Sequence, residues 1–223
     1  MHSYLIPLNI TFKQQANHKK AIGMSAYLLH QFDFYGLQTP ERRKICKAYF
    51  LKYPIHHLNE LEIIVKACFT LPQREFHYFA IELLAYHKKL WKISSIKLME
   101  YCLLHKSWWD TVDGIGSEWL GPYFKMFPEK IQGVTHKWNT SSNKWLQRSS
   151  ILFQKAYKVN TDTELLKKYI LHCSTSKEFF IQKAIGWTLR EYSKTDPEWV
   201  KDFVMMNPLA PLSKREALKR INC

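Results

Sequence analysis

The chain of 223 residues has little glycine and few of the dipeptides that make tight hairpins. Seven glycines are spread through the sequence, and this scarcity argues against a β protein. The histidines lack an H-E-x-x-H motif and any clustered spacing, so no metal site is predicted. No two cysteines form a C-x-x-C pair, and we expect them to be thiols in a reducing compartment. They are Cys46, Cys68, Cys102, Cys173 and Cys223.

Long apolar runs and nucleotide-binding motifs are also missing. Residues 1–7 carry no charged segment followed by a long apolar run, and no stretch is long enough to span a bilayer. We therefore expect no signal peptide, no membrane partner and a cytoplasmic location. The glycine-rich phosphate loops and the G-x-S-x-G elbow are absent. Nucleotide hydrolysis, dinucleotide redox chemistry and α/β-hydrolase chemistry therefore have no support.

Positive charge is what the chain has in excess. Thirty-three lysines and arginines face 19 acidic residues, and the net charge is +14. Such an excess favours a polyanion, first nucleic acid and then an acidic membrane surface or acidic protein. The alternative is a basic protein without such a partner. The hydrophobic content of 46% is that of a globular protein, and the length suits one domain over residues 1–223.

Signals for helix starts are abundant and predict an all-α protein. Thr39-Pro40-Glu41 and Asp196-Pro197-Glu198 each place a capping residue before a proline. Ser107 precedes Trp108, Trp109 and Asp110 in a related pattern. The spacing of a capping box or a close variant also begins at Asn59, Thr161, Thr175 and Ser213.

The helix starts recur at a nearly constant interval. Helices expected near Thr39, Pro72, Ser107, Ser142, Thr175 and Ser213 are separated by roughly 33 to 38 residues, the range of two-helix repeats. Second helices are expected near Asn59, Ser94, Pro128, Thr161 and Asp196. The spacing predicts a superhelical solenoid with a concave surface. An irregular helical bundle is the alternative.

One helix of each repeat should contribute to that concave surface. Basic and aromatic residues recur on the helices expected there, which predicts a concave basic face able to follow a DNA backbone. For any single lysine, an ordinary solvated position is the alternative. The residues are Arg43 and Lys47, Trp109 and Asp113, Lys144 and Arg148, and Lys183, Trp187 and Arg190.

Trp109 and Asp113 are four residues apart and so share one helix face. Trp108 points about 100° away from Trp109, so one of the two can be core while the other lines the surface. Gly114 and Gly116 weaken the helix, which we expect to end or bend just after Asp113. Four other tryptophans are assigned to packing: Trp91, Trp119, Trp138 and Trp199.

Several segments together resemble the AlkD-type DNA alkylation-repair glycosylases. The resemblance covers about residues 17–220, and Lys-Ser-Trp-Trp-Asp and Phe-Phe-Ile-Gln-Lys-Ala-Ile-Gly-Trp are its specific parts. The sequence departs from the family at Asp113-Gly114-Ile115-Gly116 and around Lys155-Ala156. The segments that carry the resemblance are residues 38–43, 106–113, 145–154, 176–192 and 208–217.

The resemblance implies a HEAT-like repeat fold and a DNA glycosylase of base excision repair. It implies release of 3-methyladenine and 7-methylguanine from alkylated double-stranded DNA, with no metal or organic cofactor and without base flipping. By the same match, Asp113, Trp109 and Trp187 are active-site residues and Arg148 is a backbone-contacting partner. Matching positions along the DNA face are Tyr27, Gln38, Thr39, Arg43, Lys183 and Arg190.

A mechanism follows for such a substrate. An alkylated purine is already cationic, so one carboxylate, Asp113, could suffice to stabilise the sugar cation and position water. Arg148 would hold the phosphate or orient Asp113. We expect a monomer without an obligate protein partner. Two other classes stay open: a catalytically silent DNA-binding paralogue, and a helical-repeat scaffold for an acidic protein.

Overall fold

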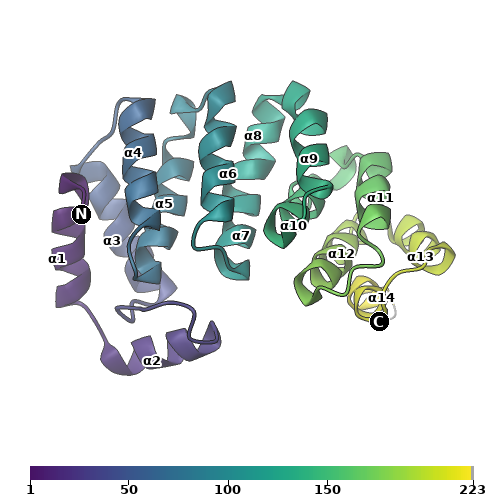
Figure 1. The fold of residues 1–223 in the computed structure, drawn as a ribbon, viewed down its shortest axis with the longest axis horizontal. Coiled ribbons are helices and arrows are strands. Elements are labelled where there is room, and N and C mark those ends of the chain that lie inside the picture. Colours follow the sequence, from purple (N-terminus) through teal and green to yellow (C-terminus); the bar gives the residue numbers. More distant parts are fainter. Residues whose placement is uncertain (222–223) are drawn as a thin grey trace. The chain divides into compact units, whose positions relative to one another are not determined.

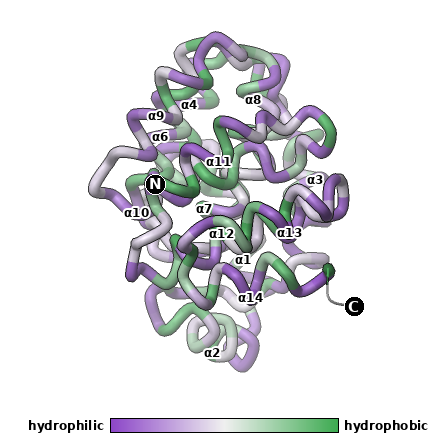
Figure 2. The backbone as a smooth tube through the Cα atoms, turned by 90° about the vertical axis from the view of Figure 1, so that its right-hand side faces the viewer, coloured by the Kyte–Doolittle hydropathy of each residue, from purple (hydrophilic) through white to green (hydrophobic). Residues whose placement is uncertain are grey.

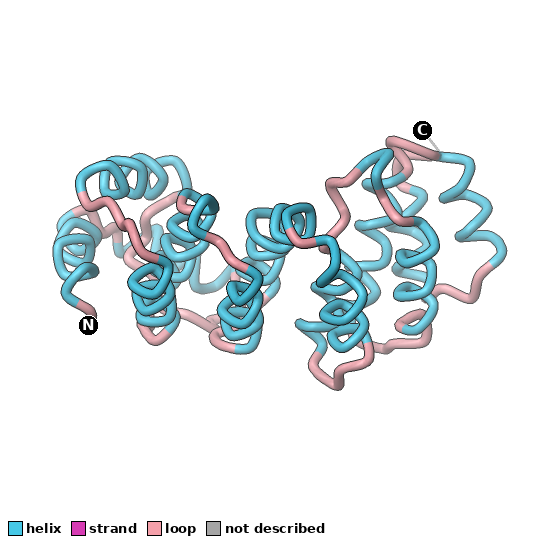
Figure 3. The backbone as a smooth tube through the Cα atoms, turned by 90° about the horizontal axis from the view of Figure 1, so that it is seen from above, coloured by secondary structure: helices cyan, strands magenta, loops and turns pink. Residues whose placement is uncertain are grey.

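A computed structural model describes residues 1–221 as helices joined by loops (Figure 3). This part of the chain contains no strand, and its one isolated β-bridge joins Asp33 and Gln73. The all-α prediction is therefore confirmed. None of the described helices is long and apolar enough to cross a membrane.

The contacts of the chain group into two compact units, Met1–Lys106 and Ser107–Cys223. In the first unit α4 and α5 pack against each other, and α3 also packs on α5 (Figure 1). Its helices are α1 (Ile6–Gln14), α2 (His18–Tyr27), α3 (Thr39–Lys52), α4 (Leu58–Phe69), α5 (Arg74–Tyr86) and α6 (Ile96–Leu104), with short 3-10 turns at Ser3–Leu5, Lys88–Leu90 and Ile93–Ser95.

The second unit is built around α10, which packs against α7, α9, α11 and α12. Its helices are α7 (Trp109–Ile115), the π-helical turn η4 (Gly116–Leu120), α8 (Gly121–Met126), α9 (Ile131–Asn139), α10 (Lys144–Leu152), α11 (Thr163–His172), α12 (Phe179–Tyr192), α13 (Pro197–Met206) and α14 (Pro211–Leu218). Short 3-10 turns lie at Pro128–Lys130 and Lys158–Asn160.

The repeat interval is regular. The first helices of successive pairs, α3, α5, α7, α10 and α12, begin at residues 39, 74, 109, 144 and 179, which are 35 residues apart each time. Like helices also pack on like: α10 on α12, α12 on α14, α4 on α6 and α9 on α11. The predicted helical repeat is therefore confirmed. One domain with a continuous concave face through both units stays a prediction.

The capping predictions had mixed outcomes. Asp196 caps α13 as predicted, since its side chain accepts a hydrogen bond from the Trp199 amide. The cap of α11 is Asp162, one residue beyond Thr161. The prediction for Ser213 was wrong, because α14 already begins at Pro211 and Ser213 lies inside it.

Amphipathic helices supply the core. Hydrophobic and hydrophilic residues alternate along the single helices (Figure 2), and the apolar faces of α10 to α14 form one cluster that includes Ile151, Ile170 and Ile185. Burying one such side chain stabilises the fold by about 1.5–3 kcal/mol. The packing role assigned to four tryptophans is confirmed: Trp91, Trp119 and Trp138 are buried, and Trp199 packs against the cluster.

The described cysteines are free and buried. Burial raises the pKa of the Cys173 thiol to about 11, although a hydrogen bond from Asn139 opposes the shift. These thiols are therefore protonated at neutral pH. Cys223 lies outside the described residues.

The helix that carries Asp113 changes its winding where the glycines occur. The regular α7 ends at Ile115 and continues through η4 into α8, with helical backbone angles at Gly116 and Gly121. A π-helical turn interrupts the α-helical bonding, often near functional sites. The predicted end of the α-helix is thus found two residues after Asp113.

Helices α12 and α14 approach each other closely at Gly186. The Ser213 hydroxyl donates to the Gln182 carbonyl oxygen, at 2.9 Å. A Cβ atom on Gly186 would lie 3.0 Å from the Ser213 carbonyl oxygen and would collide with the Glu216 side chain. Only glycine fits this contact without displacing one of the helices.

We expect Gly186→Ala to lower the free energy of unfolding by about 1–3 kcal/mol, the usual cost of overpacking a tight contact. Urea denaturation measures it. Gly133→Ala in α9 is the matched control, because nothing lies within 4 Å of the added Cβ. The control should be stabilised by up to about 1 kcal/mol. Equal effects of the two substitutions would contradict the close-contact explanation.

Candidate active site

The site is centred on an ion pair between Asp113 of α7 and Arg148 of α10. Arg148 Nε donates to Asp113 Oδ1 at 2.7 Å, and a terminal guanidinium nitrogen donates to Oδ2 at 2.8 Å. This two-point geometry fixes both the position and the plane of the carboxylate. The Asp113 side chain keeps 22% of its surface exposed to solvent.

Arg148 is fully buried. Its remaining terminal nitrogen donates to the Phe180 carbonyl oxygen of α12, and its guanidinium carbon lies 5.2 Å from the centre of the Trp187 ring. The guanidinium is closed off from solvent in this structure and holds both oxygens of the Asp113 carboxylate. The predicted contact of Arg148 with the DNA backbone stays a prediction.

The predicted stripe on α12 is present and meets a single carboxylate. Lys183 Nζ lies 5.0 Å from the centre of the Trp187 ring. The same Nζ is 3.1 Å from Glu216 Oε1, and Arg190 lies 2.9 Å from Glu216 Oε2. Lys219 also contacts Glu216, at 2.7 Å.

Glu216 is ionised over the whole physiological range. Burial opposes its charge, but hydrogen bonds from Lys219 and Lys183 outweigh burial and lower the pKa of Glu216 to about 2. Three cations around one carboxylate leave a net positive charge beside Trp187. That charge suits a phosphate.

The two neighbouring tryptophans have different surroundings. Trp108 belongs to an aromatic cluster, with ring centres 5.9 Å from Trp145 and 5.4 Å from Phe180. Trp109 is half-buried and is the first residue of α7, one turn before Asp113. The predicted cap at Ser107 was wrong, because Trp108 occupies the cap position. Trp108 therefore packs between the helices.

A cavity of about 220 Å³ has Asp113 in its wall. Gly116, Lys155 and Ala156 line it as well, so both segments in which the sequence departs from the resembled family meet at this cavity. The Tyr157 hydroxyl donates to the Gly121 carbonyl oxygen at 2.7 Å and joins the loop after α10 to α8.

The predicted DNA-contacting residues of the first unit are exposed. Tyr27 is 72% exposed, and Gln38 and Thr39 lie at the exposed start of α3. The Arg43 side chain is 65% exposed, with Nε 3.3 Å from Glu82 Oε1. Their contact with DNA stays a prediction.

Two partners at the site escaped the sequence analysis. The sequence analysis did not single out Glu216, which lies three residues after the capping candidate Ser213. The Phe180 carbonyl is a backbone group, so no side-chain pattern could have indicated it. Lys183 and Arg190, seven residues apart on one face of α12, could have suggested a carboxylate partner, but not which one. Residues 1–221 contain no group of three or more histidine, cysteine or acidic side chains placed to hold a metal ion.

The comparisons with known proteins agree on one family. Residues 8–221 match the family model described as DNA alkylation repair enzyme. The chain belongs to this family. A solved structure titled a predicted DNA alkylation repair enzyme, from Enterococcus faecalis, is 33% identical with a TM-score of 0.86. That match covers 93% of this chain and 97% of the other. Among curated proteins, no sequence matched.

We expect Arg148→Lys to lower the free energy of unfolding by about 3 kcal/mol, because one ammonium cannot serve both Asp113 oxygens and the Phe180 carbonyl. Urea denaturation measures the loss. Arg215→Lys, an exposed position on α14, is the control and should change little. Unchanged stability of Arg148→Lys would contradict the role given to the pair.

Proposed function

We propose that the chain is a DNA glycosylase that releases cationic alkylated purines, chiefly 3-methyladenine and 7-methylguanine, from duplex DNA in base excision repair. The observation that carries this proposal is the partly exposed Asp113 carboxylate, held at two points by the buried Arg148. Membership in the family of DNA alkylation repair enzymes supports the substrate class.

One carboxylate is enough for this substrate. Glycosidases generally use a second carboxyl group to protonate the leaving group, but a purine alkylated at N3 or N7 already carries positive charge. When the glycosidic bond breaks, its electron pair goes to the purine, which leaves neutral, and positive charge develops on the deoxyribose. Water then forms a bond to the sugar carbon and gives up a proton to the surrounding solvent, which leaves a neutral sugar hydroxyl.

Asp113 stabilises the sugar cation and positions that water. A carboxylate fixed before the reaction costs no reorganisation when the charge appears. Arg148 acts as a positioning residue, because it holds both oxygens of Asp113 and stays buried.

Trp109 and Trp187 flank the sugar in this proposal. An indole face stabilises a nearby cation by about 0.5–2 kcal/mol. Trp187 already makes such cation–π contacts, since Lys183 Nζ lies 5.0 Å and the guanidinium carbon of Arg148 5.2 Å from the centre of its ring.

Lys183 and Arg190 hold the phosphate backbone next to the reacting sugar. Both side chains are partly exposed, at 19% and 30%. Glu216 keeps them on the same side of α12. Tyr27, Gln38, Thr39 and Arg43 contact DNA from the first unit.

The enzyme recognises the lesion through the backbone, without flipping the base into a pocket. The cavity beside Asp113 supports a competing proposal, because about 220 Å³ could admit a methylated purine. The size of the alkyl group that the enzyme tolerates distinguishes recognition through the backbone from entry of the base into the cavity.

Asp113→Asn should reduce release of 7-methylguanine from methylated duplex DNA about 10²–10³-fold, the typical effect of removing one preorganised electrostatic group. DNA binding should persist, because the lysines and arginines remain. Chromatography of the released base measures the rate, and Glu118→Gln on the exposed side of η4 is the matched control.

Absence of base release by the wild-type protein would leave a silent DNA-binding protein and overturn the proposed activity. Full activity of Asp113→Asn would instead overturn only the role of Asp113.

A bulky cationic N3-alkyladenine should be released within about tenfold of the rate for 3-methyladenine, since a base that stays in the duplex does not have to fit the cavity. Single-turnover release from defined duplexes measures the ratio. Release of 3-methyladenine alone would favour entry of the base into the cavity beside Asp113.

A further inference from the structure

A groove between α1 and α3 lies in the first unit, outside the proposed active site. Its volume is about 730 Å³. Apolar and aromatic side chains form its floor, and Lys44 and Lys52 also line it. The lining includes Ile10, Ala48, Tyr49, Tyr53, Glu41, Lys44 and Lys52.

The floor is apolar and partly open. Ile10 is 50% exposed, and Ile6, one turn earlier on α1, is 48% exposed. Tyr49 and Tyr53 close one end with ring centres 4.5 Å apart. Exposed isoleucines beside a recessed floor are a common mark of a protein-binding surface.

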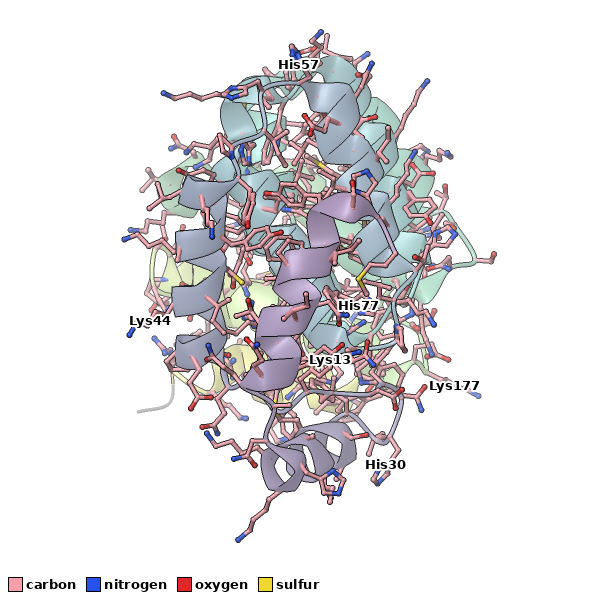
Figure 4. The ribbon with its side chains drawn as sticks, turned by 90° about the vertical axis from the view of Figure 1, so that its left-hand side faces the viewer. Lys13, His30, Lys44, His57, His77 and Lys177 are labelled. Atoms are coloured by element: carbon pink, nitrogen blue, oxygen red, sulfur yellow. The ribbon has the colours of Figure 1, made fainter. Side chains whose placement is uncertain are left out.

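The edge of the groove is positive. Neither Lys44 nor Lys52 forms an ion pair with any residue between 1 and 221, and Figure 4 shows Lys44 pointing away from α3. The negative charge of Glu41, the one acid in the lining, is balanced by Lys20, whose Nζ lies 2.9 Å from Oε1. This hydrogen bond is the main cause that lowers the pKa of Glu41.

The groove faces away from the DNA-contacting residues proposed for α3. Ala48 lies five residues after Arg43, which is roughly 140° around a helix with 3.6 residues per turn. Arg43 and Lys47 are one turn apart and share the other side. A ligand in the groove can therefore bind while DNA is held.

We infer that this groove binds an acidic amphipathic helix of a partner protein. A helix can place apolar side chains at i, i+3, i+4 and i+7 into such a floor while its acidic residues meet the lysines. The DNA backbone has no apolar side chains for the floor. A second copy of this chain is repelled by its net charge of +14.

The probe is an 18-residue fluorescein-labelled peptide of leucine, alanine and glutamate with leucine on one helix face. Fluorescence anisotropy should show saturable binding. The charge reversals Lys44→Glu and Lys52→Glu, made together, should weaken it at least tenfold. Ala48→Gln should weaken it as well, because its longer side chain fills the floor without changing the charge.

Lys47→Glu is the control for Lys44→Glu made alone. Both reverse the charge of one lysine, but Lys47 lies on the other side of α3, so its substitution should leave peptide binding unchanged. A peptide of the same composition without an apolar face should bind at least tenfold more weakly. DNA binding should be unaffected by the Lys44 and Lys52 changes.

Three results would overturn the inference. Equal binding of the scrambled peptide would show charge attraction alone. Binding of anionic phosphatidylserine vesicles through Lys44 and Lys52, with no peptide binding, would assign the groove to a membrane surface. Displacement of the peptide by short duplex DNA would show that the groove is part of the DNA-binding surface.

Discussion

The second unit depends on the burial of one guanidinium. A buried arginine is strongly destabilising unless its donors are bound, and Arg148 meets this demand with Asp113 of α7 and the Phe180 carbonyl of α12. Three first helices of successive repeats are thereby joined at one point. The same contacts leave one side of the Asp113 carboxylate open. Stability and the proposed chemistry therefore share a single ion pair.

Glu216 is the second centre of charge, and it depends on glycine. Because Gly186 has no side chain, α14 comes close enough to α12 for Glu216 to reach both Lys183 and Arg190. The two carboxylates have opposite surroundings: Asp113 is partly open beside one cation, whereas Glu216 is closed in by three. This difference suits the proposed roles, in which Asp113 stabilises a developing cation and the lysines and arginine around Glu216 bind a phosphate.

The proposed chemistry follows from the charge of the substrate. A neutral leaving base would require an acid, and the described site offers no second carboxyl group in the position of a general acid, since Glu216 is ionised. A cationic alkylated purine removes that requirement. The proposed chemistry is therefore one for alkylated DNA, which the description of the family names.

The sequence by itself determined the helical class, the repeat interval, the core tryptophans and the pairing of Trp109 with Asp113 on one face. These properties are local, because they depend on residues within one or two turns. The start of α14 was misjudged by a few residues, since Pro211 is as good a signal as Ser213. Only the tertiary structure decided that Arg148 is buried and that Glu216 gathers three cations. The partners are 35 residues apart for Arg148 and Asp113, and 26 for Arg190 and Glu216, so packing between helices determines which charges meet.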